Sequence, residues 1–350
     1  MGALDGTDLL GRIQKALDGF LADHEPALRA MGEELAPMTE EVAQFLSGGK
    51  RLRPRFCFWG HLGAGGQNSD EIVQAAAALE LFQACAIIHD DVMDGSDTRR
   101  GRPAVHRRFA NLHANEGWEG SADAFGNGAA ILLGDLCLAW ADEQLMSSGI
   151  INAEARHIFD TMRAELMAGQ YLDLLEQVRG HSTLESALRV ARFKSAKYTI
   201  VEPLHLGGCL ASASPEVLAT YTAYGMPLGE AFQLRDDLLG VFGDPSVTGK
   251  PAGDDLREGK RTALVALALE RATDRQAALV RRLLGDPALD LAGVEALQNM
   301  LIETGAVDRV EDLITDRTAQ ALAALDDTAV TPEAVAVLRE LAVAATARAH

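Results

Sequence analysis

Apolar side chains recur every three or four residues along most of this chain, which is the spacing of one face of an α-helix. Near the N-terminus, Leu9, Leu10, Ile13 and Leu17 would share such a face. No strand-like alternation is sustained over several segments. The pattern therefore predicts an all-α fold, as one helical domain over residues 1–350. Helices are expected at 5–24, 26–46, 51–63, 69–94, 102–111, 127–148, 151–176, 182–197, 199–211, 214–242, 261–272, 274–284, 289–304, 306–324 and 331–347.

Glycine-rich stretches interrupt the periodicity and mark the connections between helices. Two are long: the segment 112–128 contains four glycines, and the segment 243–260 is rich in Gly, Asp and Lys. Long glycine-rich loops in a compact domain are often lids or binding loops. For 112–128 a second interpretation stays open, that of a solvated and variable insertion.

Composition and charge argue against some classes of function. The 350 residues are 48% hydrophobic and 24% charged, an ordinary globular balance, and their formal net charge is −19. Such a charge argues against nucleic acid and against anionic membranes, because both bind proteins through clustered Lys and Arg. A polyanionic substrate would need metal ions or a local basic cluster to reverse the sign of its site.

Cysteine usage and hydropathy indicate the compartment. The longest apolar run, 129–141, has 13 residues and contains Asp135, whereas a membrane span needs about 20. The N-terminus shows no apolar signal core. We therefore expect a cytoplasmic protein without stable membrane insertion. The four cysteines form no CxxC pair and are interpreted as buried, reduced thiols: Cys57, Cys85, Cys137 and Cys209.

The strongest chemical signal is a group of three aspartates, Asp90, Asp91 and Asp94, at the end of an apolar helix. Positions i and i+4 share a helical face, so Asp90 and Asp94 would project together about one turn (~5.4 Å) apart. Carboxylates grouped there carry a large desolvation cost unless a cation lies between them. Oxygen ligands at this spacing suit Mg²⁺, which commonly takes one or two carboxylates plus substrate phosphates.

A second pair, Asp236 and Asp237, lies inside another apolar helix. A lone Asp-Asp pair is more often a solvated helix end. Two such groups, each ending or interrupting a long apolar helix, favour a metal site instead.

Cations stand beside both aspartate groups. Each of these Lys and Arg side chains could be part of a surface ion pair, and such a pair contributes little to stability. Together with metal ions, they are what one or two diphosphates need. The cations in question are Lys50 and Arg53 in a Gly-Gly turn, Arg99 and Arg100 after the first aspartates, Lys194 and Lys197 beside Tyr198-Thr199, and Lys250 and Lys260 around the loop 243–260.

These residues stand in motifs that resemble those of the trans-isoprenyl diphosphate synthase (polyprenyl synthetase) family. The resemblance covers roughly Phe45 to Thr262 and is weaker towards the C-terminus. Its motifs are GGKRLRP at 48–54, DDVMD at 90–94, TRRG at 98–101, GD at 134–135, GQYLDL at 169–174, KSAKYT at 194–199, FQLRDD at 232–237 and the TGK/GDD/GK loop at 248–260.

The resemblance implies a single large helical bundle with a central active-site cavity, a homodimer, and condensation of isopentenyl diphosphate with an allylic diphosphate. It implies about three Mg²⁺ ions, held by Asp90, Asp94 and Asp236, with Asp91 and Asp237 completing the two motifs. It further implies that Arg99, Lys194 and Lys260 bind the allylic diphosphate, with Lys250 in the same loop, that Lys50, Arg53, Arg100 and Gln83 bind isopentenyl diphosphate, and that Thr199 and Gln233 line the reacting carbons.

Two positions depart from the family pattern. The second aspartate motif often ends in a third Asp, and here that residue is Gly240. We expect activity to survive, with one metal ion bound more weakly. Ser195 stands where Thr is common, which is a mild change.

Product length is predicted from helix geometry. One helical turn rises ~5.4 Å, close to one isoprene unit, so the growing tail would pass residues spaced by turns along the helix of Asp90. Cys85 and Ala86 lie one turn before Asp90 and are small, where the family uses bulky aromatics to stop growth at fifteen carbons. Phe82, one turn further, could form a floor. A C20 product, geranylgeranyl diphosphate, is favoured, while plain core packing of Phe82 and products of C15, C25 or longer stay open.

Two rival functions remain. A terpene cyclase would share the helical fold and the metals but would not need Lys50, Arg53 and Arg100, because it binds no second diphosphate. No second metal motif of the Asn/Asp-Ser-Glu type is found. A non-catalytic partner subunit would tend to lose the first aspartate motif, which is intact here, although Gly240 keeps that interpretation open.

Overall fold

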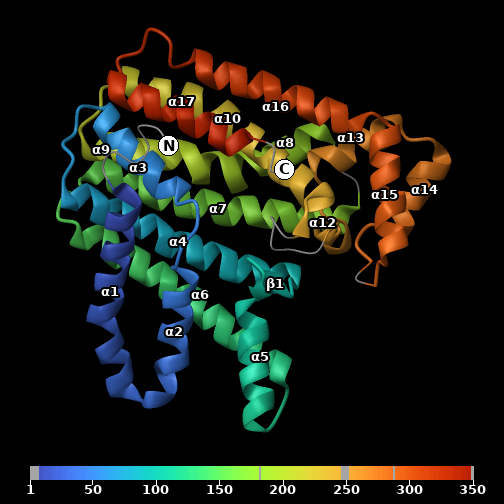
Figure 1. The fold of residues 1–350 in the computed structure, drawn as a ribbon, viewed down its shortest axis with the longest axis horizontal. Helices are drawn as coiled ribbons and strands as arrows, with labels where there is room; N and C mark the ends of the chain where they lie inside the picture. The colour runs from blue at the N-terminus through green and yellow to red at the C-terminus, as the bar shows by residue number, and fades with distance from the viewer. Residues whose placement is uncertain (1–7, 181–182, 246–251, 287, 348–350) are drawn as a thin grey trace. The chain divides into compact units, whose positions relative to one another are not determined.

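The computed structural model describes residues 8–180, 183–245, 252–286 and 288–347. In this part of the chain the regular structure is helical except for one short hairpin, so the predicted all-α fold is confirmed (Figure 1). The chain divides into two compact units: Met1–Arg156 with Pro203–Ala213, and His157–Glu202 with Ser214–His350. The single-domain expectation stays a prediction.

The first unit is built around the helix that ends in the first aspartate group. Its elements are α1 (Leu9–Met31), the 3₁₀ turn η2 (Glu33–Leu35), α2 (Ala36–Phe45), α3 (Leu52–Gly63), α4 (Asp70–Asp94), β1 (Thr98–Arg99), β2 (Arg102–Pro103), α5 (Val105–Glu116), α6 (Ala122–Ser147), the start of α7 (Ala153–Arg179) and most of α9 (Glu202–Leu210). The helix α4 packs against α1, α3, α5 and α6.

The sequence of α4 explains its central place. Asp70 and Glu71 lie in its first turn, where negative charge offsets the helix dipole, and Gly95 ends it in a left-handed conformation. Between these ends the helix is apolar on all sides, and nearly every residue from Ile72 to Ile88 is buried or half-buried. A helix that is hydrophobic all round belongs in a core.

The expected loop at 112–128 is wrong in most of its length. The helix α5 continues to Glu116 and α6 begins at Ala122, so only 117–121 connect them. Gly126 is helical because it lies against the neighbouring helix: a Cβ there would be 2.2 Å from the carbonyl oxygen of His106. This glycine permits close packing of two helices and does not loosen the chain.

The second unit is organised around α10. Its elements are most of α7 (Ala153–Arg179), α8 (Leu184–Ala191), the π-helix η3 (Arg192–Val201), the start of α9 (Glu202–Leu210), α10 (Pro215–Phe242), α12 (Asp254–Glu258), α13 (Ala263–Arg271), α14 (Asp274–Leu283), α15 (Leu291–Glu303), α16 (Ala306–Ala323) and α17 (Pro332–Thr346). The helix α10 packs along η3 and α16, and Figure 1 shows α16 and α17 running beside it.

Two expected boundaries are corrected here. The predicted helix 102–111 begins only at Val105, because 102–103 pair with β1 in the hairpin. The predicted break at residue 198 is absent, because α8, η3 and α9 follow one another without interruption. Both corrections fall in segments that carry candidate site residues.

The four cysteines are free and buried, as expected. Among the described residues, α4 and α6 are long and apolar enough to cross a membrane by length and composition alone. In α4, 72% of the most apolar window is buried inside the protein, and in α6 39%. Core helices pass the same test, so the expected absence of membrane insertion stays a prediction.

Gly126 and Gly128 allow a matched test of the packing between α5 and α6. We expect Gly126→Ala to lower stability by about 1–3 kcal/mol, since the new methyl group would overlap backbone atoms. Gly128→Ala should raise stability by up to about 1 kcal/mol, because no atom lies within 4 Å of the added carbon and Ala is the better helix former. Urea-unfolding midpoints that shift in the same direction for both variants would contradict this.

Candidate active site

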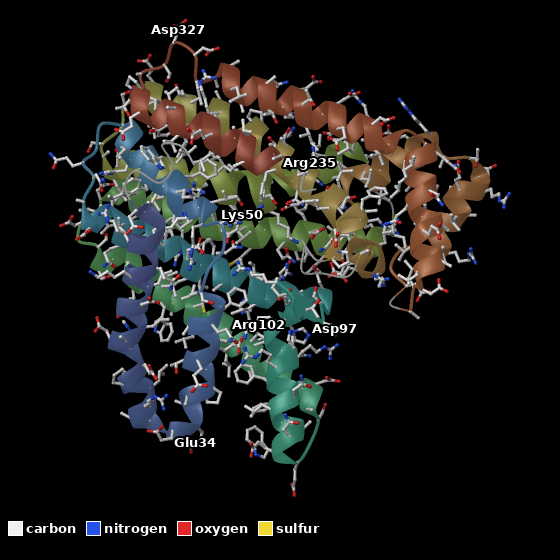
Figure 2. All side chains as sticks on the ribbon, viewed as in Figure 1. Glu34, Lys50, Asp97, Arg102, Arg235 and Asp327 are labelled. Atoms are coloured by element: carbon white, nitrogen blue, oxygen red, sulfur yellow. The ribbon has the colours of Figure 1, made fainter. Side chains whose placement is uncertain are left out.

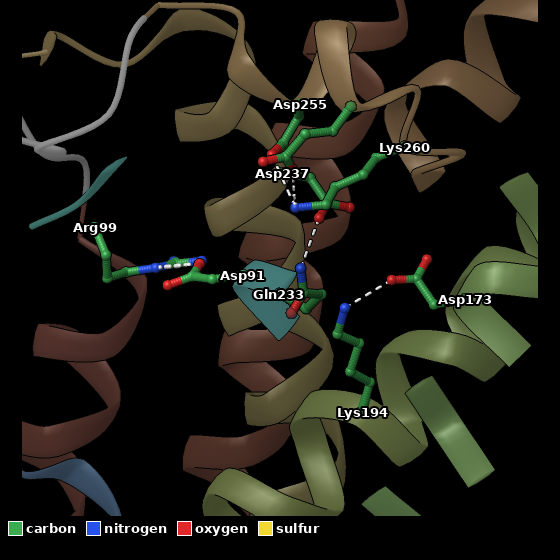
Figure 3. A network of polar contacts seen from close by, with 9 residues as sticks. Asp91, Arg99, Asp173, Lys194, Gln233, Asp237, Asp255 and Lys260 are labelled. Atoms are coloured by element: carbon green, nitrogen blue, oxygen red, sulfur yellow. Dashed lines mark hydrogen bonds and ion pairs between the residues drawn. The ribbon is translucent and has the colours of Figure 1, made fainter. Parts of the chain in front are cut away.

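The three aspartates at the end of α4 have different surroundings. Asp90 and Asp94 are half-buried, as expected for neighbours on one helical face. Asp91 points elsewhere and is fully buried. Arg99 holds it, donating from Nε to Asp91 Oδ1 at 2.9 Å and from Nη2 to the same oxygen (Figure 3). Asp91 therefore anchors Arg99, while its predicted role as a metal ligand stays a prediction.

The hairpin after α4 sends its two adjacent arginines in different directions. Thr98 pairs with Pro103 and Arg99 with Arg102, so Arg100 and Gly101 form the two-residue turn. Both turn residues have positive φ, 53° and 73°, as hairpin turns of this length prefer. Arg100 lies over the ring of Phe45, 5.5 Å from its centre, while Arg99 binds Asp91.

Several guanidinium groups gather around this turn. Desolvation lowers the pKa of Arg100, and the like charges of Arg51, Arg99 and Arg53 lower it further, although part of the side chain remains exposed. A cavity of about 260 Å³ beside it is lined by Phe45, Arg99, Arg100, Arg102 and Arg108 among others. Arg102 lies at the hairpin in Figure 2. A strongly acidic chain thus carries a concentrated positive region here.

The cations of the segment Gly48–Pro54 differ in burial: one is buried and two are more exposed. Arg51 is buried and donates to Glu80 Oε2 on α4 at 2.5 Å and to Gln14 Oε1 on α1 at 2.6 Å. Lys50 is exposed (Figure 2), and Arg53 is half-buried. Gln83, also half-buried, lies on α4 one turn after Glu80. Arg51 thus fixes the segment, and Lys50 and Arg53 remain as its candidate diphosphate ligands.

In the second unit, a π-helix carries Lys194, Ser195 and Thr199. A π-helix has i→i+5 bonds and is found frequently at functional sites. Lys194 Nζ donates to Asp173 Oδ2 at 2.7 Å (Figure 3), and Ser195 Oγ donates to Gln233 Oε1. Thr199 is fully buried. The structure thus joins Ser195 to Gln233, and the predicted role of Thr199 stays a prediction.

Glycines on two neighbouring helices let this π-helix pack closely. A Cβ on Gly169 of α7 would lie 2.8 Å from the backbone nitrogen of Lys194. A Cβ on Gly229 of α10 would lie 2.3 Å from the Cα of Ala196. The backbone that carries Lys194 and Ser195 is therefore held from two sides.

The two aspartates of the second pair also differ in burial. Asp236 is exposed on α10, and Asp237 is buried and accepts a hydrogen bond from Gln233 Nε2 at 2.7 Å. Burial, together with the charges of nearby Asp255, Asp236 and Asp173, raises the pKa of Asp237 to about 8, against the lowering effect of the hydrogen bond from Gln233. Asp237 therefore carries a proton at neutral pH unless cations approach it.

A buried arginine fixes the rotation of α10 next to this pair. Arg235, labelled in Figure 2, donates to Glu311 Oε1 and Oε2 of α16 at 2.8 and 2.7 Å. Its Nε donates to the carbonyl oxygen of Thr346 in α17 at 3.2 Å. Bidentate contacts of this kind are directional, so Arg235 ties the helix that carries Asp236 to two others.

Two predicted cations lie near the end of α10 in sequence. Lys260 Nζ lies 3.3 Å from Asp255 Oδ1 and 2.5 Å from Glu258 Oε2 (Figure 3). Lys250 lies outside the described residues, so its predicted role stays a prediction.

The carboxylates fit a metal that completes its shell with substrate. Among the described residues, no three His, Cys, Asp or Glu side chains form a ready-made metal site. The helix α4 instead offers two carboxylates on one face, and α10 offers an exposed one. Oxygen donors in ones and twos, with phosphates supplying the rest, suit Mg²⁺.

The residues predicted to limit product length are core residues of α4. Phe82 and Cys85 are buried, and Ala86 is half-buried. Burial raises the pKa of Cys85 to about 12, and its Sγ lies 3.8 Å from His89 Nδ1. His89 Nε2 in turn lies 3.1 Å from the carbonyl oxygen of Ile131 on α6. Their effect on chain length stays a prediction.

Comparison with known proteins decides the family. The model of the family "Polyprenyl synthetase" matches residues 36–301. The chain belongs to the polyprenyl synthetase family. It is a prenyltransferase, a trans-prenyl diphosphate synthase, and the resemblance inferred from the motifs is confirmed.

Individual relatives of this synthetase differ in product. It is 32% identical over 293 residues to a geranylgeranyl diphosphate synthase of Mycobacterium tuberculosis, covering 83% of this chain and 79% of that one. It is 31% identical to a geranylfarnesyl diphosphate synthase of Aeropyrum pernix, covering 76% and 79%. A solved geranylgeranyl pyrophosphate synthase of Corynebacterium glutamicum, complexed with isoprenyl diphosphate and magnesium, is 41% identical, with a TM-score of 0.94 over 99% and 100% of the two chains.

Sequence reasoning about the synthetase missed two contacts that the structure shows. Asp173 holds Lys194, and Ser195 touches Gln233. Both residues stand in quoted motifs, GQYLDL and KSAKYT, without an assigned role. The sequence signal for Asp173 is its place in the GQYLDL motif. Its partner Lys194 lies on another helix, so only the fold, which brings α7 beside η3, shows the contact.

Gly229→Ala tests whether the π-helix must keep its place in the synthetase. The new methyl group would overlap the backbone of Ala196, so we expect η3 to shift and kcat to fall about 10²-fold, as a displacement of ~1 Å can cause. Gly225→Ala is the comparison, because the nearest atom it would meet is a side-chain methyl of Val201 at 2.8 Å, and its kcat should fall less. Wild-type kcat in a folded Gly229→Ala variant would contradict the prediction.

Proposed function

We propose that this synthetase joins isopentenyl diphosphate head-to-tail to allylic diphosphates and makes geranylgeranyl diphosphate. The proposal rests on a difference between the carboxylates: some hold a cation at a fixed position, and others are more exposed. Asp91 and Asp173 each hold one cation, Arg99 and Lys194, at a fixed position. Asp90 and Asp236 are more exposed than their neighbours Asp91 and Asp237, whereas Asp94 is half-buried and both of its carboxylate oxygens are buried. Held cations and accessible carboxylates are what a metal–diphosphate complex needs.

The reaction follows from these groups. The C1–oxygen bond of the allylic substrate breaks, and its electron pair leaves with the diphosphate, whose growing charge Arg99, Lys194 and Lys260 stabilise. The double bond of isopentenyl diphosphate, held by Lys50, Arg53, Arg100 and Gln83, forms the new carbon–carbon bond. A proton then leaves the adjacent carbon for the released diphosphate. About three bound Mg²⁺ ions would neutralise the leaving group.

Ser195 joins Gln233, already expected from the sequence, in the proposed catalytic group. Their contact places a hydroxyl and an amide together, at the part of the π-helix next to Lys194. Polar groups so fixed can orient a substrate's reacting carbons and its departing proton without moving during the reaction. Thr199, fully buried on the same π-helix, is retained in the proposed catalytic group.

The C20 product has two supports. The Mycobacterium and Corynebacterium relatives named above are geranylgeranyl synthases. Cys85 and Ala86 are small enough to let a chain pass, and Phe82 one turn further is large enough to stop it. The geranylfarnesyl synthase among the relatives keeps a C25 product as the alternative.

We also propose that the synthetase is a cytoplasmic homodimer that pairs through α6. Phe125, Leu132, Ala139 and Met146 are seven residues apart and exposed. A seven-residue apolar repeat on a helix surface is the pattern of a helix–helix seam. The exposed fractions of Phe125, Leu132 and Met146, at 39%, 63% and 47%, are large for apolar side chains. A second copy would cover them through a two-fold axis.

The activity is tested by incubation with Mg²⁺, isopentenyl diphosphate and, separately, dimethylallyl, geranyl and farnesyl diphosphates, with product lengths read by mass spectrometry. We expect C20 product from each primer and none after chelation of the metal. Asp90→Asn with Asp94→Asn is the matched negative control. Folded protein that elongates no primer would refute the synthase proposal and favour a cyclase or a partner subunit.

Phe82→Ala tests the floor of the product cavity. Removing the ring opens space beyond Cys85, so we expect C25 and longer products to appear beside C20. Phe58→Ala is the control, because Phe58 is a fully buried ring on α3 and its loss should destabilise the fold without lengthening the product. An unchanged product from Phe82→Ala would place the floor elsewhere.

Leu132→Glu tests the pairing of two copies. A carboxylate in an apolar seam is costly to desolvate, so we expect the dimer to give way to monomer in size-exclusion chromatography with light scattering. Ile302→Glu on α15 is the control, because Ile302 is similarly exposed, at 56%, and lies outside α6. A Leu132→Glu protein that stays dimeric would exclude this surface.

A further inference from the structure

Gly240 leaves a space that another residue fills. It stands in the second aspartate motif, where the family often has a third Asp, and lies on the last part of α10. A Cβ added to it would lie 1.9 Å from Oδ2 of Asp255, 2.4 Å from its Cγ and 3.0 Å from its Oδ1. The carboxylate of Asp255 thus rests where any side chain at 240 would begin.

The backbone of Asp255 is held firmly. It belongs to the short helix α12, whose Leu256 is buried in the core and accepts a hydrogen bond from the backbone nitrogen of Gly285 at 2.9 Å. The backbone nitrogen of Lys260 donates to the carbonyl oxygen of Asp255 at 3.0 Å. A new side chain at 240 would therefore turn the Asp255 carboxylate aside and leave α12 in place.

The Asp255 carboxylate shares Lys260 with Glu258. The ammonium lies 3.3 Å from Asp255 Oδ1 and 2.5 Å from Glu258 Oε2, and the side chains of Lys260 and Asp255 are 17% and 13% exposed (Figure 3). Two carboxylates fix a flexible side chain better than one. Without Asp255, Lys260 would be drawn towards Glu258 alone.

We propose that Gly240 and Asp255 are a matched pair, in which the absent side chain at 240 lets Asp255 position Lys260 for the allylic diphosphate. Asp255 is a positioning residue, acting through Lys260. The inference rests on the proposed function. It replaces the expectation that Gly240 merely weakens a metal ion: restoring the family's Asp at this position damages the site, because the new carboxylate would displace the one that holds Lys260.

The test compares Gly240→Ala, Gly240→Asp and Asp255→Asn with wild type. Each is titrated with Mg²⁺ and an unreactive allylic thiodiphosphate by calorimetry, and assayed for kcat and for the KM of each substrate. We expect all three to bind the analogue about tenfold more weakly, the effect of losing about one well-placed charged contact. The KM of isopentenyl diphosphate should not change. Thermal midpoints should stay near wild type, because the first atoms met at 240 belong to a side chain.

A double variant and a neighbouring control separate positioning from general damage. If Gly240→Ala acts only by moving Asp255, adding Asp255→Asn should weaken binding no further. Asp254→Asn, on the same helix, should bind the analogue like wild type. Additive losses in the double variant, or tighter binding by Gly240→Asp, would overturn the pairing.

The behaviour of the wild-type protein shows whether a negative result refutes the proposed function or only the pairing of Gly240 with Asp255. Wild type that binds no analogue and elongates no primer refutes the proposed function, and the pairing with it. Wild type that binds and elongates, with Gly240→Asp equal to it in affinity, refutes the pairing alone. Should the variants at 240 not fold, Asp255→Asn and Lys260→Gln decide the matter, since the pairing requires similar losses of analogue binding from both.

Discussion

In each of the two units, the candidate functional residues depend on keeping cations in place inside a protein of strongly negative charge. A flexible Lys or Arg loses side-chain entropy whenever it is fixed on a ligand, and that loss opposes binding. This chain reduces the loss by fixing its cations before substrate arrives. Arg99 rests on buried Asp91, Lys194 on Asp173, Lys260 on Asp255 and Glu258, while Arg51 and Glu80 fix the segment that carries Lys50 and Arg53. Part of the excess negative charge therefore lies on carboxylates that hold these cations in position.

The same arrangement explains why adjacent motif residues have unlike roles. Neighbours in a helix do not share a face, so Asp90 and Asp91 could not both point the same way, nor could Asp236 and Asp237. In each pair the structure buries the second carboxylate and leaves the first accessible. In the TRRG hairpin the separation comes from the turn, which directs Arg100 towards Phe45 while Arg99 binds Asp91.

The fold class and the charged motifs could be predicted from the sequence, because helical periodicity and the spacing of carboxylates are local properties. Contacts made across helices could not. The glycines of 112–128 were expected to loosen the chain, but Gly126 is needed where α6 meets the backbone of α5. The proximity of Asp255 to Gly240 has no signal in the sequence. The contact between Ser195 and Gln233 has none either, because a π-helix has no periodicity signal of its own.

The π-helix has a consequence for how this segment tolerates changes of length. Because each of its turns contains more residues than an α-helical turn, η3 is an α-helix with residues to spare. Deleting one residue between 192 and 201 would not open a gap. It would let the segment close into an ordinary α-helix, with the helices on either side kept in phase. In a regular α-helix, by contrast, a one-residue deletion rotates everything beyond it by about 100°. A deletion in η3 would therefore act locally, by changing how Lys194 and Ser195 are directed relative to α10.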